Sequence, residues 1–146
     1  MSEARSIYTG EQPGMGGWFS IGAVSDEDVL MGVLEVLPFA AHVRTRILDQ
    51  FNRSCLTYNF KNLDERLFLA QVSERRYPDA DRYMGLNEAV QVETIQFDPK
   101  DNTMKRAIRD LQKATVETME YRDVDLRANW EPIPEFGHWS ALVRLR

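Results

Sequence analysis

The chain has 146 residues, of which 43% are hydrophobic and 28% are charged, and this composition fits one globular domain with a core of its own. Its net charge is −5, with 18 basic against 23 acidic residues, which argues against a nucleic-acid binder because such proteins need a basic excess. The single cysteine, Cys55, excludes a scaffold of internal disulfides.

The N-terminal segment and the apolar runs indicate a cytoplasmic protein without a membrane span. Residues 1–17 carry scattered apolar residues instead of the continuous apolar core of a signal peptide. The longest apolar run, 29–41, is interrupted by a glycine, a glutamate and a proline, so it is too polar for a membrane helix. Because residues 10–17 are rich in glycine, we expect a Gly-rich N-terminal arm over 1–17, packed on its own domain or on a partner. A single α+β domain is expected over 18–146.

The first elements predicted are one strand and two helices. The apolar run 18–24 predicts a strand, and Ser25 followed by three acids predicts the start of a helix over 25–37. Pro38 suits a first helical turn, so a second helix is predicted over about 38–52. Its apolar stripe recurs every four residues, at Phe39, Val43, Ile47 and Phe51.

The middle of the chain favours strands. Alternation over 55–60 predicts a half-buried strand, which would make Cys55 a small core residue. An apolar run predicts a strand over 67–72, although a capping-box pattern just before it also allows a helix. A loop is expected over 74–88, and β-branched residues predict a strand over 89–97.

The last part of the chain combines a third helix with two strands. Apolar residues spaced by three and four predict a helix over 103–121, and alternation predicts strands over 123–130 and 139–145. Because helices and strands do not alternate, a parallel sheet is disfavoured. The predicted fold class is α+β, a single domain in which about three helices pack on one face of an antiparallel sheet.

The chemistry-bearing residues form no recognisable catalytic or metal-binding pattern. Cys55 and the two histidines lack the spacing of a zinc site, so we predict no metal, no cofactor and no catalytic residue. His138 is the one alternative, since Glu135 lies three residues before it and a histidine with a carboxylate can act as a base. The alternative function is therefore a small-ligand-binding or hydrolytic domain with a pocket near His138. Tyr83 is a further polar candidate for this pocket.

Two features indicate contact with a protein partner. Arg106, Arg109 and Lys113 would share one face of the third helix, where basic residues early in the helix oppose the helix dipole. The alternative for this stripe is an ordinary solvated face. The second feature is the Pro-rich segment 131–138, which brings three large apolar residues close in sequence: Ile133, Phe136 and Trp139. If exposed, these would suit an interface, and if they point inward they belong to the core.

The function predicted from these features is non-catalytic protein–protein interaction. The chain would serve as a structural subunit of a larger assembly, of a viral or secretion-machine type, or as a stoichiometric inhibitor of the immunity-protein kind. Its partners would be proteins, in a homo- or hetero-oligomer, with neither nucleic acid nor membrane. Binding of phosphate or RNA through Arg106, Arg109 and Lys113 remains a third, less favoured reading.

Overall fold

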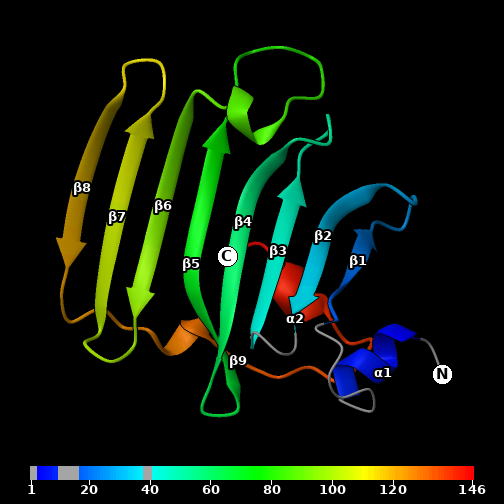
Figure 1. Ribbon diagram of the computed structural model, residues 1–146. Coiled ribbons are helices and arrows are strands. Elements are labelled where there is room, and N and C mark those ends of the chain that lie inside the picture. The colour runs from blue at the N-terminus through cyan, green and yellow to red at the C-terminus, as the bar shows by residue number, and fades with distance from the viewer. Residues whose placement is uncertain (1–2, 10–16, 38–40) are drawn as a thin grey trace.

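A computed structural model describes residues 3–9, 17–37 and 41–146, and Figure 1 shows one broad antiparallel sheet built from them. The strands are β1 (Phe19–Val24), β2 (Leu30–Leu37), β3 (His42–Leu48), β4 (Ser54–Leu63), β5 (Arg66–Arg76), β6 (Gln91–Asp98), β7 (Thr103–Asp110), β8 (Thr115–Tyr121) and β9 (Trp130–Pro132). The helices are α1 (Glu3–Thr9) and α2 (Ser140–Val143), with short 3-10 turns η2 (Leu86–Glu88) and η3 (Arg127–Asn129).

The described strands follow one another through the sheet in chain order. Each strand from β1 to β8 pairs antiparallel with the next, and β9 joins the beginning of β5 at Arg66–Phe68. Tight turns make this possible, and nearly all of them contain a residue with a positive φ angle. Between β4 and β5, Asp64 and Glu65 have φ angles of 50° and 60°, the left-handed pair typical of a two-residue hairpin turn. The sheet is therefore built from local hairpins.

The core lies on one face of β1–β5. Leu34 of β2, Tyr58 and Phe60 of β4 and Leu142 of α2 are all at most 1% exposed. Figure 1 shows α2 behind β2 and β3, and the hydroxyl of Thr45 on β3 donates to the carbonyl of Leu142 at 2.9 Å. The face that carries Thr45 is thus the covered face, and its apolar side chains are buried by α1, α2 and the C-terminal segment.

The predicted α+β fold with three helices is wrong, because the segments expected to be helical form strands. The predicted helix 25–37 is a turn followed by β2, and the described part of 38–52 is β3 with its flanking turns. The predicted helix 103–121 is the hairpin of β7 and β8. Within it, Asp110 accepts backbone hydrogen bonds from residues 112 and 113, which stabilises a turn in the middle of the predicted helix.

The predicted strands were confirmed in the first two thirds of the chain and were mostly wrong in the last part. The strands expected at 18–24, 55–60, 67–72 and 89–97 correspond to β1, β4, β5 and β6. The strand expected over 123–130 is mostly loop and η3, and the one over 139–145 contains α2. In both, buried leucines fill the core from irregular or helical backbone, namely Leu126 and Leu142. Residues 10–16 and the predicted helix start at Pro38 lie outside the described residues, whereas α1 lies within the expected arm.

Candidate functional site

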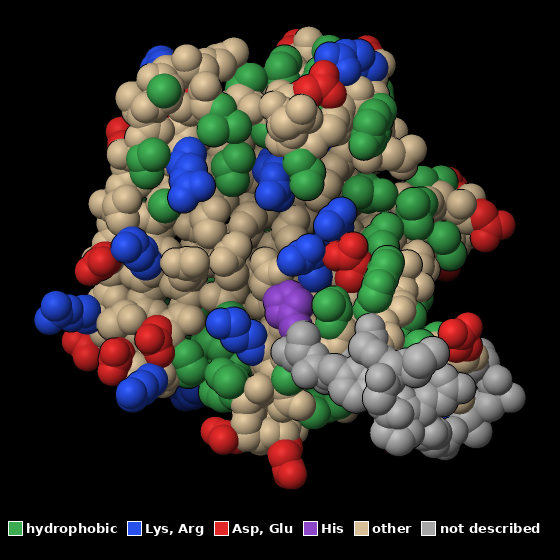
Figure 2. All heavy atoms as spheres, viewed as in Figure 1, with side chains coloured by type: hydrophobic (Ala, Val, Ile, Leu, Met, Phe, Trp, Pro, Cys, Tyr) green, Lys and Arg blue, Asp and Glu red, His purple; other side chains and the backbone are tan. Residues whose placement is uncertain are grey.

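The sheet has a second face, which we call the open face because no described helix packs on it. Residues opposite each other on paired strands point to the same side of a sheet, so the strand register assigns side chains to this face. Arg44 and Arg46 alternate with Thr45 on β3 and therefore lie on the open face. Figure 2 views the molecule from this side and shows Lys and Arg side chains spread around a broad uncharged area.

A single line of polar side chains crosses the open face from β2 to β8, and we call it the polar row. Its members are direct register partners on successive strands: Glu35, Arg44, Asn59, Gln71, Gln96, Lys105 and Glu120. Three amides occupy the middle, flanked on each side by a cation and then by a carboxylate. Seven strands thus contribute one polar group each to a continuous ladder.

Hydrogen bonds and ion pairs hold most of the polar row in place. Arg44 lies 3.5 Å from the carboxylate of Glu35, and its Nε donates to Oδ1 of Asn59 at 3.2 Å. The amide nitrogen of Gln96 donates to Gln71 at 3.3 Å, and Lys105 lies 3.8 Å from Glu120. These contacts restrict the rotamers of the side chains, so little further side-chain entropy would be lost if a ligand bound them.

The next row of the open face carries hydroxyls. Thr57, Ser73, Thr94 and Thr118 lie beside the polar row on β4, β5, β6 and β8. Ser73 accepts from the amide of Gln71 at 3.2 Å and lies 3.5 Å from the hydroxyl of Thr94. Thr57 and Ser73 are buried, at 7% and 5% exposure. This row therefore adds polar groups that neighbouring side chains largely cover.

Six members of the polar row, all except Glu35, line a trough with a volume of about 810 Å³. His42, Lys61 and Arg122 add cationic or titratable groups to its walls, while Leu63 and Phe68 make one end apolar. Lys61 forms no ion pair with the described residues, so its ammonium group is available to a ligand. The trough thus offers amides, cations and an apolar end within one concavity.

The pKa of His42 is lowered from its ordinary value of 6.5. Burial at the wall of the trough is the main cause, and the positive charges of Arg44 and Lys61 act in the same direction. A hydrogen bond with Asn59 and the carboxylate of Glu35 oppose this shift without cancelling it. His42 is therefore mostly neutral at pH 7 and serves as a polar, uncharged neighbour of the row.

The open face is basic although the protein is acidic. Its strands place seven Lys or Arg and three Asp or Glu side chains on this side: Arg44, Arg46, Lys61, Arg66, Arg75, Lys105 and Arg109 against Glu35, Asp98 and Glu120. The net charge of the whole chain is −5. The remaining surface is therefore strongly acidic, so the charge of the protein is distributed asymmetrically between the open face and the rest of the surface.

The structure separates the three basic residues predicted to share one face. Arg106 points to the opposite side of β7 from Arg109, because their positions differ by an odd number on a strand. Arg106 binds Glu93 at 2.6 Å, and Lys113 lies 3.7 Å from Asp110 in the β7–β8 turn. Only Arg109 is on the open face, so the expected basic stripe does not exist as one surface.

The predicted apolar partner residues lie mostly inside the protein's own packing. Phe136 and Trp139 form an aromatic cluster with Tyr8 of α1 and Phe19 of β1, with ring centroids 5.2–6.2 Å apart. The hydroxyl of Tyr8 also donates to the carbonyl of Pro134. Ile133 is 42% exposed and is the one of the three that faces solvent substantially.

The alternative site at His138 is not enclosed. Its Nδ1 lies 3.7 Å from a carboxylate oxygen of Glu135, and these side chains are 76% and 88% exposed. Tyr83 is exposed in the loop between β5 and β6, and none of these three residues lines the trough. No group of three His, Cys, Asp or Glu residues in the described ranges could hold a metal ion. In those ranges no helix is long and apolar enough to cross a membrane.

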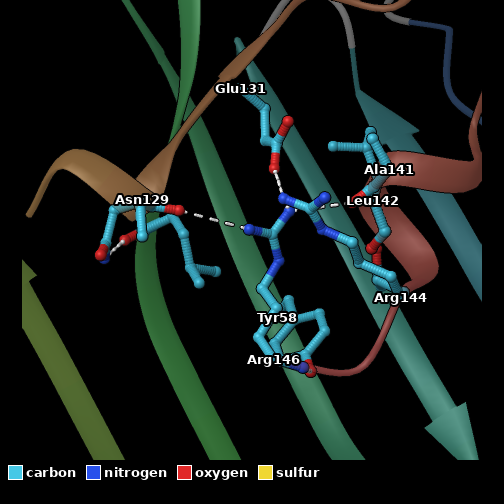
Figure 3. Close-up of polar contacts among 10 residues, drawn as sticks. Tyr58, Asn129, Glu131, Ala141, Leu142, Arg144 and Arg146 are labelled. Carbon is cyan, nitrogen blue, oxygen red and sulfur yellow. Dashed lines mark hydrogen bonds and ion pairs between the residues drawn. The ribbon is translucent and has the colours of Figure 1, made fainter.

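A charge cluster centred on the buried carboxylate of Glu131 binds the C-terminal segment to the covered face of the sheet. Glu131 of β9 accepts hydrogen bonds from Arg144 and Arg146, and Figure 3 shows these side chains pointing toward one another beside Tyr58. The backbone N–H of Arg146 donates to the hydroxyl of Tyr58 at 3.0 Å. The guanidinium of Arg146 also lies 5.4 Å from the ring centre of Phe60. These contacts have a structural role, since they fasten the segment that covers the core.

Sequence reasoning missed both the polar row and the charge cluster. The polar row has a local signal, because each of its amides lies in a segment of alternating polar and apolar residues, but its members meet only through the strand register. The charge cluster has no local signal, since Tyr58 is far from Glu131 and Arg146 in sequence. Comparisons with protein-family models, curated proteins and solved structures gave no match to this chain. A function is therefore inferred from the geometry of the chain itself.

Proposed function

We propose that this protein is a non-catalytic binding protein whose open face receives an acidic segment of a protein partner. The observation that carries the proposal is the polar row, in which three central amides and the cations that flank them line a trough. The role covers both a subunit of a larger assembly and a stoichiometric inhibitor, since each needs one surface that binds a protein.

The central amides suit the backbone of an extended segment. Asn59, Gln71 and Gln96 each carry two N–H donors and one carbonyl acceptor, which exceeds what the hydrogen bonds within the row consume. A peptide backbone offers alternating donors and acceptors in the same way. The amides therefore bind the main chain of the segment, while the cations and apolar groups around the amides contact the side chains of the segment.

The cations suit carboxylates on that segment. Lys61 has no carboxylate partner among the described residues, and Lys105 holds Glu120 only at 3.8 Å with both side chains more than half exposed. Exposed ion pairs of this kind contribute little, so a partner carboxylate can replace Glu120 at small cost. Leu63, which is partly exposed at the wall of the trough, can contact one apolar side chain of the same segment.

The shape of the site favours a protein segment over a small molecule. Small-molecule pockets are enclosed and lined mostly by apolar groups, whereas this trough is only partly enclosed and its lining includes several amide and charged side chains. A polyanion as long as a nucleic acid would extend onto the acidic remainder of the surface, where it would be repelled. The alternative pocket near His138 is not supported, because the side chains of His138 and Glu135 are both exposed.

The test is binding of a fluorescein-labelled peptide rich in Asp and Glu with one Ile, measured by anisotropy, against a Lys-rich peptide of the same length. The double variant Lys61→Gln/Lys105→Gln removes two positive charges from the trough. The control Lys100→Gln/Lys113→Gln removes two from the hairpin turns. The pairs are matched, because each contains one lysine near a carboxylate and one without an ion pair to a described residue.

We expect the acidic peptide to bind with a salt-dependent affinity that the trough variant weakens by about tenfold and the control leaves unchanged. In a ¹⁵N-labelled sample, the side-chain amide signals of Asn59, Gln71 and Gln96 shift on binding. The proposal is overturned if the peptide does not bind, or if both double variants weaken it equally. Competition by citrate alone, with no peptide binding, would identify a small anion as the ligand instead.

A further inference from the structure

β8 forms one end of the sheet, and its outer edge pairs with no other described strand. Figure 1 shows it at the left margin, next to β7. The β7–β8 register runs from Met104↔Tyr121 to Asp110↔Thr115 without a shift, so β8 is a regular strand over its whole length. Its backbone N–H and C=O groups on the outer side are therefore presented as an even ladder.

Apart from two glutamates, β8 lacks the features that usually protect a free edge. Its seven residues, TVETMEY, contain no lysine, proline or glycine and no bulge. Val116 is 60% exposed and Tyr121 is 40% exposed. At the other end of the sheet, β1 is interrupted by a register shift at Ala23/Val24 and its start is packed against Tyr8 of α1. The two edges are thus unequal, and β8 is the one suited to pairing.

We infer that β8 pairs antiparallel with β8 of a second copy of this chain, about a two-fold axis at Thr118. A two-fold axis perpendicular to the sheet keeps each face on its own side, so only residues of the same parity can lie opposite each other. With the axis at Thr118, all seven residues find partners: Thr115 opposite Tyr121, Val116 opposite Glu120, and Glu117 opposite Met119. The two sheets become one continuous sheet.

The positions of the two glutamates on β8 favour this register, because it keeps like charges apart. An axis at Glu117 would place that carboxylate directly opposite its own copy, which is destabilising. An axis at Met119 would leave two residues of each strand without a partner. With the axis at Thr118, each glutamate of β8 lies opposite an apolar residue, and no like charges lie opposite each other.

The strands next to β8 complete this pattern. On the open face, the order across the junction is Lys105, Glu120, then Val116 and Arg109 of the second copy. On the covered side it is Arg106, Met119, then Glu117 and Ile108 of the second copy. Each glutamate therefore has a cation within two strands, and the exposed Val116 gains cover from the aliphatic part of Glu120. The open faces of the two copies also become one surface.

The first test is the oligomeric state by light scattering and sedimentation equilibrium over a dilution series. We expect a species of twice the monomer mass of 16.9 kDa. Val116→Glu places a carboxylate opposite Glu120 at two sites per dimer and should weaken association about tenfold or more. Leu111→Glu is the matched control, because Leu111 is similarly exposed but lies in the turn outside the paired residues. It should leave association unchanged.

The second test reads the register directly in a Cys55→Ala background. Thr118→Cys places two thiols opposite each other across the axis, where Cα atoms lie about 4.5–5.5 Å apart and a disulfide can form. Glu120→Cys places its two thiols four residues apart along the strands, about 14 Å, which is too far. Oxidation should cross-link the first variant only.

Three results would overturn the inference. A monomer at every concentration would remove it, and so would a dimer that Val116→Glu and Leu111→Glu affect equally. Cross-linking through Glu120→Cys in place of Thr118→Cys would reject the register. Circular dichroism of Val116→Glu provides the check on folding, and the exposure of Val116 makes a native spectrum the expected result.

Discussion

Glu131→Ala should destabilise the protein strongly, because it removes the carboxylate that pairs with two arginines of the C-terminal segment. The side chains of Glu131 and Arg146 are 9% and 14% exposed, and they lie 2.7 Å apart. Removing one partner of a buried ion pair costs about 3–5 kcal/mol. Arg146 retains the carbonyl of Ala141 at 2.8 Å and the ring of Phe60, so we expect the lower end, about 3 kcal/mol.

The assay is urea unfolding followed by tryptophan fluorescence and far-UV circular dichroism. A loss of about 3 kcal/mol corresponds to a fall in melting temperature of about 10 °C for a domain of this size. The control is Asp125→Ala, which breaks the exposed pair of Asp125 with Arg127 and should leave the unfolding free energy near the wild-type value. A double-mutant cycle of Glu131→Ala with Arg146→Ala should show strong non-additivity.

The reasoning would be refuted if Glu131→Ala cost no more than Asp125→Ala. Additive effects of Glu131→Ala and Arg146→Ala would likewise show that the two residues do not act as a pair. In either case the C-terminal segment would owe its position to Leu142 and Val143 rather than to the charge cluster.

Three further outcomes are expected. Gly32→Ala should destabilise the protein by about 1–3 kcal/mol in urea unfolding, because its Cβ would lie 2.7 Å from the carbonyl oxygen of Arg46, whereas Gly22→Ala meets only the end of a leucine side chain. The pKa of His42 is lowered in the folded state, so the unfolded chain binds more protons than the folded chain as the pH falls through 6.5. The free energy of unfolding should therefore decrease over this pH range. The variant His42→Gln should show a smaller decrease. Burial raises the pKa of the Cys55 thiol, so it should react with a disulfide reagent at pH 7.5 more slowly than free cysteine does.

Each of these has a contrary result. Equal costs for Gly32→Ala and Gly22→Ala would show that the β2–β3 approach can relax. An unchanged stability profile in His42→Gln would mean that another group determines the pH dependence. Fast labelling of Cys55 in the native protein would contradict its half-buried position on β4.

Strands in which polar and apolar residues alternate strictly could be predicted from the sequence. Strands whose apolar residues recur every four positions were predicted wrongly as helices. A spacing of four residues is common to one face of a helix and one face of a strand, since four is close to one helical turn and is twice the strand period. Val43 and Ile47 on β3, or Met104 and Ile108 on β7, therefore fit both patterns. Arg44 and Arg46, which alternate with the apolar residues of β3, were the signal for a strand.

The turns explain the rest of the error. Hairpin turns are recognised by Asn-Gly or Asp-Gly, but the β4–β5 turn uses Asp64 and Glu65 and the β7–β8 turn contains Ala114 at a φ of 53°. Ordinary residues are held in the left-handed conformation there because the pairing of long strands on either side outweighs the local cost. No local rule would have divided 103–121 into two strands.

The sequence by itself determined that the chain has a substantial apolar core, an acidic total charge, and alternating segments able to form an antiparallel sheet. Tertiary structure alone decided which polar groups meet. The polar row exists because the register of seven strands aligns single residues from distant segments, and Glu131 is buried because α2 and the C-terminal arginines fold over the sheet. Local patterns specify which face a side chain occupies, whereas its neighbours on that face depend on non-local strand pairing.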